Sequence, residues 1–140
     1  MLICEMAAYY RKNGSSIKAR LEEIYAKFGY YLNAVDSFSF PGLSGMDKMK
    51  GIMETLRKDS PKDFAGIAVK ESLDYLDSEK TGLPKANVLL YTLVNGESII
   101  VRPSGTEPKI KAYYTTLGKT KEEAKKEKEK LAKALQPIFS

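Results

Sequence analysis

Two helical patterns of apolar positions and one extended pattern occupy the first forty residues. Apolar side chains recur three or four residues apart in two stretches separated by a polar break at 13–15: Ile3, Met6, Ala7 and Tyr10, then Ile17, Leu21, Ile24 and Phe28. This spacing predicts two short helices. Gly29 is predicted to end the second helix in a left-handed conformation. Tyr30 to Phe40 is rich in aromatic and β-branched residues and is predicted to be a strand.

The next forty-five residues predict a helix, a weak strand and a loop. Pro41-Gly42 ends the preceding strand, and Ser44 is placed to cap a helix. The apolar stripe of this helix is interpreted as core and consists of Met46, Met49, Met53 and Leu56. Gly66 to Glu71 alternates weakly as a strand, whereas Asp77 to Lys85 is rich in turn residues and is predicted to be a loop.

The clearest local signal is a β-hairpin. The runs Asn87 to Val94 and Glu97 to Arg102 are rich in β-forming residues, and Asn95-Gly96 between them tolerates the positive φ angles of a type I′ turn. A two-residue turn would set Val94 opposite Glu97, Thr92 opposite Ile99 and Leu90 opposite Val101. These pairs predict one apolar face away from the turn.

A third strand and a final helix follow the hairpin. Ile110 to Thr115 is predicted to pair beside it, and Thr120 to Leu135 is predicted to be helical. One side of this helix carries Ala124, Leu131 and Leu135, continued by Ile138. On its surface Glu122 with Lys126 and Glu129 with Lys133 are spaced for ion pairs. Strands in the middle with helices around them predict an α+β fold.

Composition limits the chemistry that this chain can perform. Its 140 residues, 43% of them hydrophobic and 29% charged, suffice for one compact core. Histidine is absent, which removes the commonest general base and the commonest metal ligand. The single cysteine, Cys4, excludes an intrachain disulfide, and we expect a cytoplasmic protein without a membrane-spanning segment.

The segment 102–111 between the hairpin and the third strand has the residue types of a phosphate site. Arg102 offers a permanently charged guanidinium, Ser104 and Thr106 offer hydroxyl donors, and Gly105 allows backbone N–H groups to approach an anion. Pro103 and Pro108 restrict the loop, and alternation from a buried Ile110 turns Lys111 toward the same side. Glu107 would repel a phosphate, so we expect it to face outward or to hold a nearby lysine. An ordinary constrained β-turn remains an alternative.

The string from Val101 to Lys111, VRPSGTEPKIK, resembles the phosphate-binding loop of the α-D-phosphohexomutases, the phosphoglucomutase/phosphomannomutase family. The resemblance implies that Arg102, Ser104, Gly105 and Thr106 bind the phosphate of a phosphosugar. It implies the same role for Lys111, with Lys109 a weaker candidate. Residues 41–140 are similar to the fourth domain of that family, a small antiparallel sheet flanked by helices that is TATA-box-binding-protein-like. Residues 1–40, with the two N-terminal helices, look like the tail of the third domain and its connecting strand.

In the whole enzyme, as the resemblance implies, a phosphoserine exchanges a phosphoryl group with a hexose phosphate through a hexose 1,6-bisphosphate intermediate. The fourth domain holds the phosphate that is not transferred and closes the cleft. The histidine-containing loops and the Asp-rich magnesium loop of the family are missing here. We therefore expect no catalytic residue, metal site or cofactor in this chain and no turnover by it alone, with Mg²⁺ belonging to the full-length enzyme.

Two other functions remain open from the sequence. The net charge is +5, and residues 119–133 hold seven lysines against four glutamates, so a nucleic-acid-binding module is the alternative function. Alternating Lys and Glu with an apolar back is more typical of a solvated helix, and we expect neither nucleic acid nor membrane as a partner. A structural domain without a ligand is the third possibility. The sequence does not choose among glucose, mannose, glucosamine and pentose phosphates.

Overall fold

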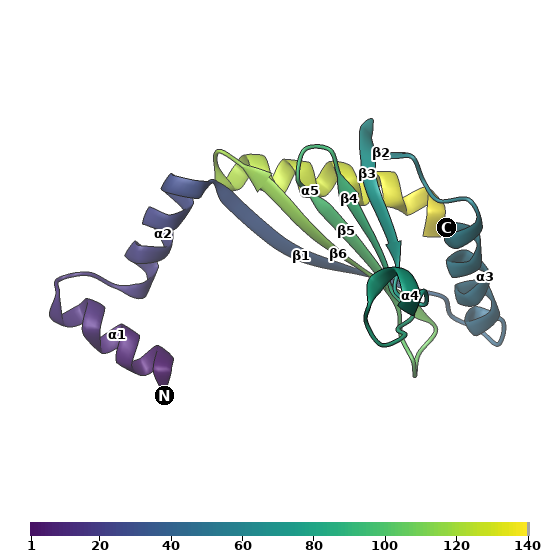
Figure 1. The fold of residues 1–140 in the computed structure, drawn as a ribbon, viewed down its shortest axis with the longest axis horizontal. Coiled ribbons are helices and arrows are strands. Elements are labelled where there is room, and N and C mark those ends of the chain that lie inside the picture. The colour runs from purple at the N-terminus through teal and green to yellow at the C-terminus, as the bar shows by residue number, and fades with distance from the viewer. Residues whose placement is uncertain (140) are drawn as a thin grey trace.

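The computed structural model describes residues 1–139, which form a six-stranded antiparallel sheet and its helices (Figure 1). The strands are β1 (Tyr30–Ser39), β2 (Asp63–Phe64), β3 (Ile67–Asp74), β4 (Leu89–Leu93), β5 (Ser98–Pro103) and β6 (Lys109–Gly118). The helices are α1 (Leu2–Lys12), α2 (Ile17–Phe28), α3 (Gly45–Lys58), α4 (Ser78–Thr81), α5 (Lys121–Leu135) and the 3-10 turn η1 (Gln136–Phe139). The strand order is β1-β6-β5-β4-β3-β2, which confirms the predicted α+β class.

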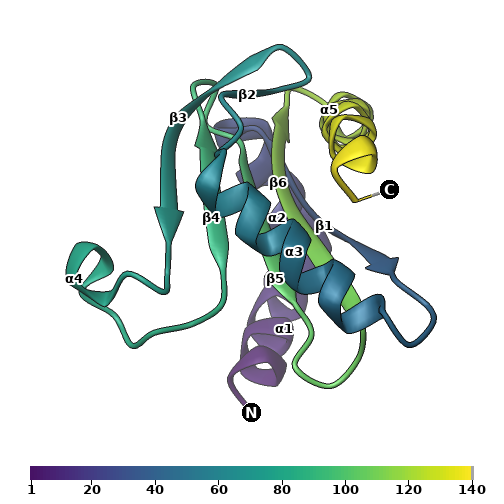
Figure 2. The same ribbon diagram turned by 90° about the vertical axis from the view of Figure 1, so that its right-hand side faces the viewer.

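The core lies between one face of this sheet and the helices α3 and α5 (Figure 2). On β6 this core face carries Ile110, Ala112, Tyr114 and Thr116, all at most 1% exposed. The apolar stripe of α5 packs against it through Leu131 and Leu135. We call the opposite side of the sheet the outer face. Arg102, Lys111 and Tyr113 lie there because side chains alternate along each strand.

The two N-terminal helices are confirmed, and they extend away from one end of the sheet (Figure 1). Neither helix contains a buried residue, although α2 begins at a regular cap in which Ser16 accepts a hydrogen bond from the Ala19 N–H. Gly29 has φ +94° but ψ 164°. The left-handed cap predicted there is therefore wrong, because the chain runs directly into β1. That strand pairs with β6 along its whole length, and the predicted division at residue 40 stays a prediction.

Helix α3 differs from its prediction at the first turn. Met49, Met53 and Leu56 are buried as predicted, but Met46 is 37% exposed. The helix starts at Gly45, and a side chain there would approach the Phe40 carbonyl oxygen to 1.9 Å, so the backbone itself occupies the space below the first turn. Ser44 stands at the N-cap position without a side-chain capping hydrogen bond.

The hairpin forms, but its predicted register is wrong by one residue. Tyr91 faces Ile99 and Leu89 faces Val101, so the buried face consists of Leu89, Tyr91, Leu93, Ile99 and Val101. Leu93 donates its N–H to the Glu97 carbonyl and accepts from the Gly96 N–H. The loop therefore has three residues, and of these only Gly96 has a positive φ, +86°. A tight turn closed by one left-handed glycine replaces the type I′ turn, which needs two positive φ angles.

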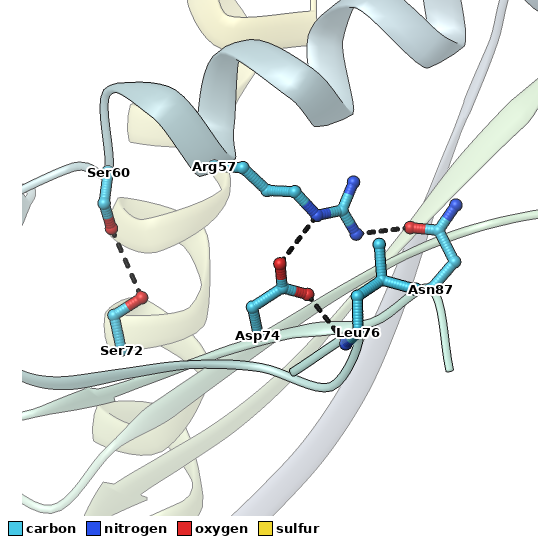
Figure 3. A network of polar contacts seen from close by, with 6 residues as sticks. All are labelled: Arg57, Ser60, Ser72, Asp74, Leu76 and Asn87. Atoms are coloured by element: carbon cyan, nitrogen blue, oxygen red, sulfur yellow. Dashed lines mark hydrogen bonds and ion pairs between the residues drawn. The ribbon is translucent and has the colours of Figure 1, made fainter. Parts of the chain in front are cut away.

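The predicted loop 77–85 contains one helical turn, α4, and a polar network fixes the chain around it (Figure 3). Arg57, at the end of α3, donates from Nε to Asp74 Oδ2 at 2.9 Å and from Nη2 to Asn87 Oδ1. Asp74 also accepts from the Leu76 N–H. This network ties the end of α3 to the end of β3, and the chain after β3 to the residues before β4.

The last helix is confirmed, with Thr120 capping it through the Glu123 N–H. Its predicted ion pairs, Glu122 with Lys126 and Glu129 with Lys133, do not form within the described chain. Instead Lys128 contacts both carboxylate oxygens of Asp36 at 2.7 Å, and Lys130 pairs with Glu127. The Asp36 contact links α5 to β1. Within residues 1–139, none of the helices combines the length and apolar character needed to span a bilayer.

Candidate functional site

The connection between β5 and β6 forms one wall of an open concavity of about 260 Å³. Its lining residues are Arg102, Pro103, Ser104, Gly105, Thr106, Lys111 and Tyr113. All five residues predicted to bind phosphate therefore lie around the same space. Arg102 leaves the end of β5, the loop supplies the small polar residues, and Lys111 returns on β6. That they bind phosphate stays a prediction.

The two cations of the site lie opposite each other on the adjacent strands β5 and β6, on the same face of the sheet. Arg102 is the register partner of Lys111 in the β5–β6 pair, which places their Cβ atoms about 5 Å apart. Like charges directly opposite each other destabilise a sheet. Within residues 1–139, no carboxylate lies within ion-pair distance of either side chain. The pair is therefore a positive site without an ion-pair partner at the end of the outer face.

Ser104 organises the loop between the two strands. Its hydroxyl oxygen accepts long hydrogen bonds from the N–H groups of Thr106 (3.4 Å) and Glu107 (3.3 Å), and its own N–H donates to the Lys109 carbonyl at 2.8 Å. The hydroxyl proton of Ser104 remains available as a donor. In this conformation the Thr106 N–H is directed to Ser104, whereas the Gly105 N–H has no acceptor within the described chain.

Gly105 is not required by the backbone conformation. Its φ lies outside the positive region, and a Cβ built at this position would meet no atom within 4 Å. By contrast, Gly96 has a positive φ, and Gly45 has no room for a side chain. The fold thus places no demand for glycine at 105, a residue that lines the concavity.

Glu107 is held away from the concavity by a lysine, as predicted. Its carboxylate forms an ion pair with Lys109, and that hydrogen-bonded contact lowers the pKa of Glu107 below its ordinary value, with a smaller contribution from the charge of Lys111. Lys109 is thereby occupied and does not line the concavity. Of the two lysines on β6, only Lys111 is directed to the site.

The loop is anchored from behind by the segment that leads into α3. The Phe40 N–H donates to the Pro108 carbonyl at 2.8 Å, and the Pro108 ring approaches Gly45 closely. Together with Pro103 in the last position of β5, these contacts limit the conformations of the loop. A loop that is already ordered loses less free energy when it binds a ligand.

Two lining residues are not among those predicted to bind phosphate: Pro103, which was predicted only to restrict the loop, and Tyr113, which was not predicted at all. Tyr113 follows Lys111 by two residues on β6, and the alternation that assigns Lys111 to the outer face assigns Tyr113 there too. Its side chain is 36% exposed. The alternation therefore contains the signal, but it does not distinguish Tyr113 from an ordinary strand residue.

Within residues 1–139, no three side chains of the types His, Cys, Asp and Glu lie close enough together to hold a metal ion. Several carboxylates are paired with basic side chains, as Asp36 is with Lys128 and Asp74 with Arg57, whereas Glu97 is buried and accepts a hydrogen bond from the Leu117 N–H. Among residues 1–139, the only charged side chains that line the concavity are the cations Arg102 and Lys111. This arrangement suits an anion.

Comparison with known proteins decides the family. The model of the phosphoglucomutase/phosphomannomutase C-terminal domain matches residues 49–134, more than half of the chain. The chain belongs to this family. The matched range includes the whole concavity, so the loop between β5 and β6 lies inside the family domain.

Individual phosphohexomutases agree with this assignment. A phosphoglucomutase of Staphylococcus aureus (strain MSSA476) is 37% identical over 124 residues, which cover 81% of this chain and 22% of the relative. A phosphoglucomutase of Staphylococcus saprophyticus is 35% identical over 114 residues, covering 74% and 20%. The chain thus spans about a fifth of the length of the curated relatives it matches.

A solved structure shares the fold. The open form of pp63/parafusin, a phosphoglucomutase from Paramecium, superposes with a TM-score of 0.58 at 18% sequence identity, over 95% of this chain and 24% of that one. The likeness supports the antiparallel sheet with its helices as a phosphohexomutase domain fold.

Proposed function

We propose that this chain is the part of a phosphosugar mutase that binds the phosphate group which is not transferred, and that it closes the active-site cleft around the substrate. The substrate would be a hexose phosphate or the hexose 1,6-bisphosphate intermediate, as in the interconversion of glucose or mannose 1-phosphate and 6-phosphate. The observation that carries this proposal is the facing pair Arg102 and Lys111, without a carboxylate partner, on one small concavity.

Each member of the site has a distinct role in this proposal. Arg102 binds two phosphate oxygens with its planar guanidinium, and Lys111 adds a point charge from the neighbouring strand. The Gly105 N–H and the hydroxyls of Ser104 and Thr106 donate to the remaining oxygens. None of these residues is a nucleophile or a base. The domain therefore contributes position and charge neutralisation to a reaction whose catalytic residues lie elsewhere.

The remaining parts of the parent polypeptide are the other partners in this proposal. Residues 1–40 would belong with the preceding domain, which suits the absence of buried side chains in α1 and α2, while β1 connects it to the sheet. The Mg²⁺ of the full-length enzyme would be held outside this chain, whose described residues contain no fitting ligand cluster. A cytoplasmic location suits Cys4, an exposed free thiol.

Backbone amide shifts in NMR test the proposal. The chain is titrated at low ionic strength with glucose 1,6-bisphosphate and with inorganic phosphate. We expect shifts centred on residues 102–106 and Lys111 that disappear in Arg102→Ala. Arg11→Ala is the matched control, because it removes the same charge from an exposed position in α1, far along the chain from the site. It should leave the shifts unchanged.

Three results would contradict the proposal. If the amide shifts decreased equally in Arg102→Ala and Arg11→Ala, the anion would bind through the overall charge of the chain. Silence in the loop, with shifts on α5 when an oligonucleotide is added, would favour the nucleic-acid module instead. Mutase turnover by a contaminant-free preparation of this chain would show that it holds catalytic residues of its own.

A further inference from the structure

The concavity has an aromatic wall next to its two cations. Tyr113 lines it together with Arg102 and Lys111, and its cross-strand partners on the outer face are Ile100 on β5 and Val35 on β1. Val35 is 52% exposed. The ring of Tyr113 therefore lies in a small apolar area, which adjoins the two cations Arg102 and Lys111.

The adjacent residue, Tyr114, is a tyrosine with a structural role on the same strand. Tyr114 is 1% exposed, belongs to the core cluster and has Lys128 over its ring. Tyr113 makes no ring–ring contact and no hydrogen bond through its hydroxyl within residues 1–139. Packing within the described chain accounts for Tyr114 but not for Tyr113, which lines the concavity.

The spacing suits a phosphate ester of a ring. Residues 111 and 113 on one strand are separated by about 6.5 Å. In a hexose phosphate, the ester oxygen and at most one carbon atom connect the phosphorus to the pyranose ring. A phosphate held by Arg102 and Lys111 therefore brings the sugar within reach of Tyr113 when the ester extends along β6 away from the loop. Sugar rings present an apolar C–H surface that packs against aromatic rings.

We propose that Tyr113 is a specificity-determining residue whose ring contacts the sugar of the bound hexose phosphate while Arg102 and Lys111 hold its phosphate. This inference rests on the proposed function, since it needs a phosphate at the two cations. It adds a preference for cyclic sugar phosphates over other phosphate esters, which the cations alone do not provide.

Calorimetry of the full chain at pH 8 tests the inference with two probes, glucose 6-phosphate and methyl phosphate, which share the ester phosphate but not the ring. Wild type should bind glucose 6-phosphate about threefold to tenfold more tightly than methyl phosphate. Tyr113→Ala and Tyr113→Leu should bind both probes with equal affinity, and Tyr113→Phe should keep the preference. Methyl phosphate should bind equally well to all four proteins.

Tyr31→Ala is the matched control, because Tyr31 is another half-exposed tyrosine on the outer face, at β1, and does not line this concavity. It should keep the preference. If both probes bind in an Arg102-dependent way and the preference is absent or survives in Tyr113→Ala and Tyr113→Leu, the role of Tyr113 is wrong and the phosphate site stands. If neither probe binds to wild type, the proposed function and this inference both fail.

Discussion

The two faces of the sheet differ in the role of their side chains, even between neighbouring residues of one strand. On β6, the core face carries Ile110, Ala112 and Tyr114, all fully buried under α5 and α3. The outer face carries Lys111 and Tyr113 at the positions between them. A side chain on the core face is explained by its packing within the chain. Packing within residues 1–139 does not explain the outer-face pair of cations, and we propose that their partner is a ligand.

This difference separates stability from function at the level of single residues. Burial of apolar area stabilises the fold, so substitutions on the core face should lower the free energy of unfolding. Arg102 opposite Lys111 lowers stability in the absence of an anion. Substitutions at the outer-face site should therefore affect ligand binding and leave the fold nearly unchanged.

The largest expected effect comes from the two adjacent tyrosines. Tyr114→Ala should lower the free energy of unfolding by about 3–5 kcal/mol, because it leaves a cavity in the core. Tyr113→Ala should lower it by less than about 1 kcal/mol, because that side chain is partly exposed and closes no cavity. Urea unfolding of the two variants measures both values. Equal losses would show that the outer face also carries core packing.

High pH provides a second test of the core face. Burial raises the pKa of Tyr91 to about 12 from 10, so the folded protein keeps a proton that the unfolded chain releases. The stability that this provides is fully present below pH 10 and is lost as the pH rises to about 12. For a two-unit shift it amounts to roughly 2–3 kcal/mol.

Tyr91→Phe isolates this contribution, because it removes the titrating hydroxyl and keeps the ring. At pH 8 the variant should be at least as stable as wild type, since the buried hydroxyl makes no hydrogen bond within the described chain. Above pH 10 its advantage in urea midpoint should grow. A constant difference between pH 8 and pH 11.5 would mean that Tyr91 titrates alike in the folded and unfolded chain.

Gly105→Ala tests whether an outer-face substitution can weaken phosphate binding without lowering stability. The position has open space and no positive φ, so alanine should leave stability unchanged or raise it by up to about 1 kcal/mol, through the smaller entropy of the unfolded chain. Because Gly105 lines the concavity, a methyl group there should hinder the approach of phosphate to the backbone N–H, and phosphate affinity should fall about fivefold to tenfold. Thermal melting and phosphate titration measure the two effects. A loss of stability with unchanged affinity would reverse the account of this glycine.

The smallest expected effect is at Glu107, beside the site. Glu107→Gln removes a negative charge near the concavity and releases Lys109 from its ion pair. Phosphate affinity should rise by less than about threefold at low salt, and the gain should disappear at high salt because exposed charges are screened. Titrations at two ionic strengths measure it. Weaker binding would show that the pair of Glu107 and Lys109 is needed to shape the loop.

The fold and the candidate site could be predicted from the sequence wherever a local pattern determined the structure. Period-2 alternation placed Ile110 in the core and Lys111 outside, and the string from Arg102 to Lys111 identified the residues that surround the concavity. The hairpin register could not be predicted from Asn95-Gly96, since two-residue and three-residue loops both accept this dipeptide. The choice follows from which residues the helices bury, here Tyr91 and Ile99, and that depends on tertiary packing.

Met46 and Tyr113 were missed for opposite reasons. Helical spacing predicts a core position for Met46, but Met46 is 37% exposed in the first turn of α3, where the backbone of Gly45 lies close to the Phe40 carbonyl. Tyr113 had the correct alternation, yet a tyrosine in a strand is compatible with either face. Only the three-dimensional arrangement of β5 and β6 brings it beside the two cations.

The effect of Lys111→Met on stability, with and without phosphate, tests the central claim most directly. In chloride the variant should be as stable as wild type or more stable, because it removes a like charge opposite Arg102. In phosphate of matched ionic strength, at ten times the dissociation constant, binding should add about 1.4 kcal/mol to wild type and less to the variant, so that the order reverses. If Lys111→Met has the same effect on the free energy of unfolding in both salts, the two cations do not form an anion site.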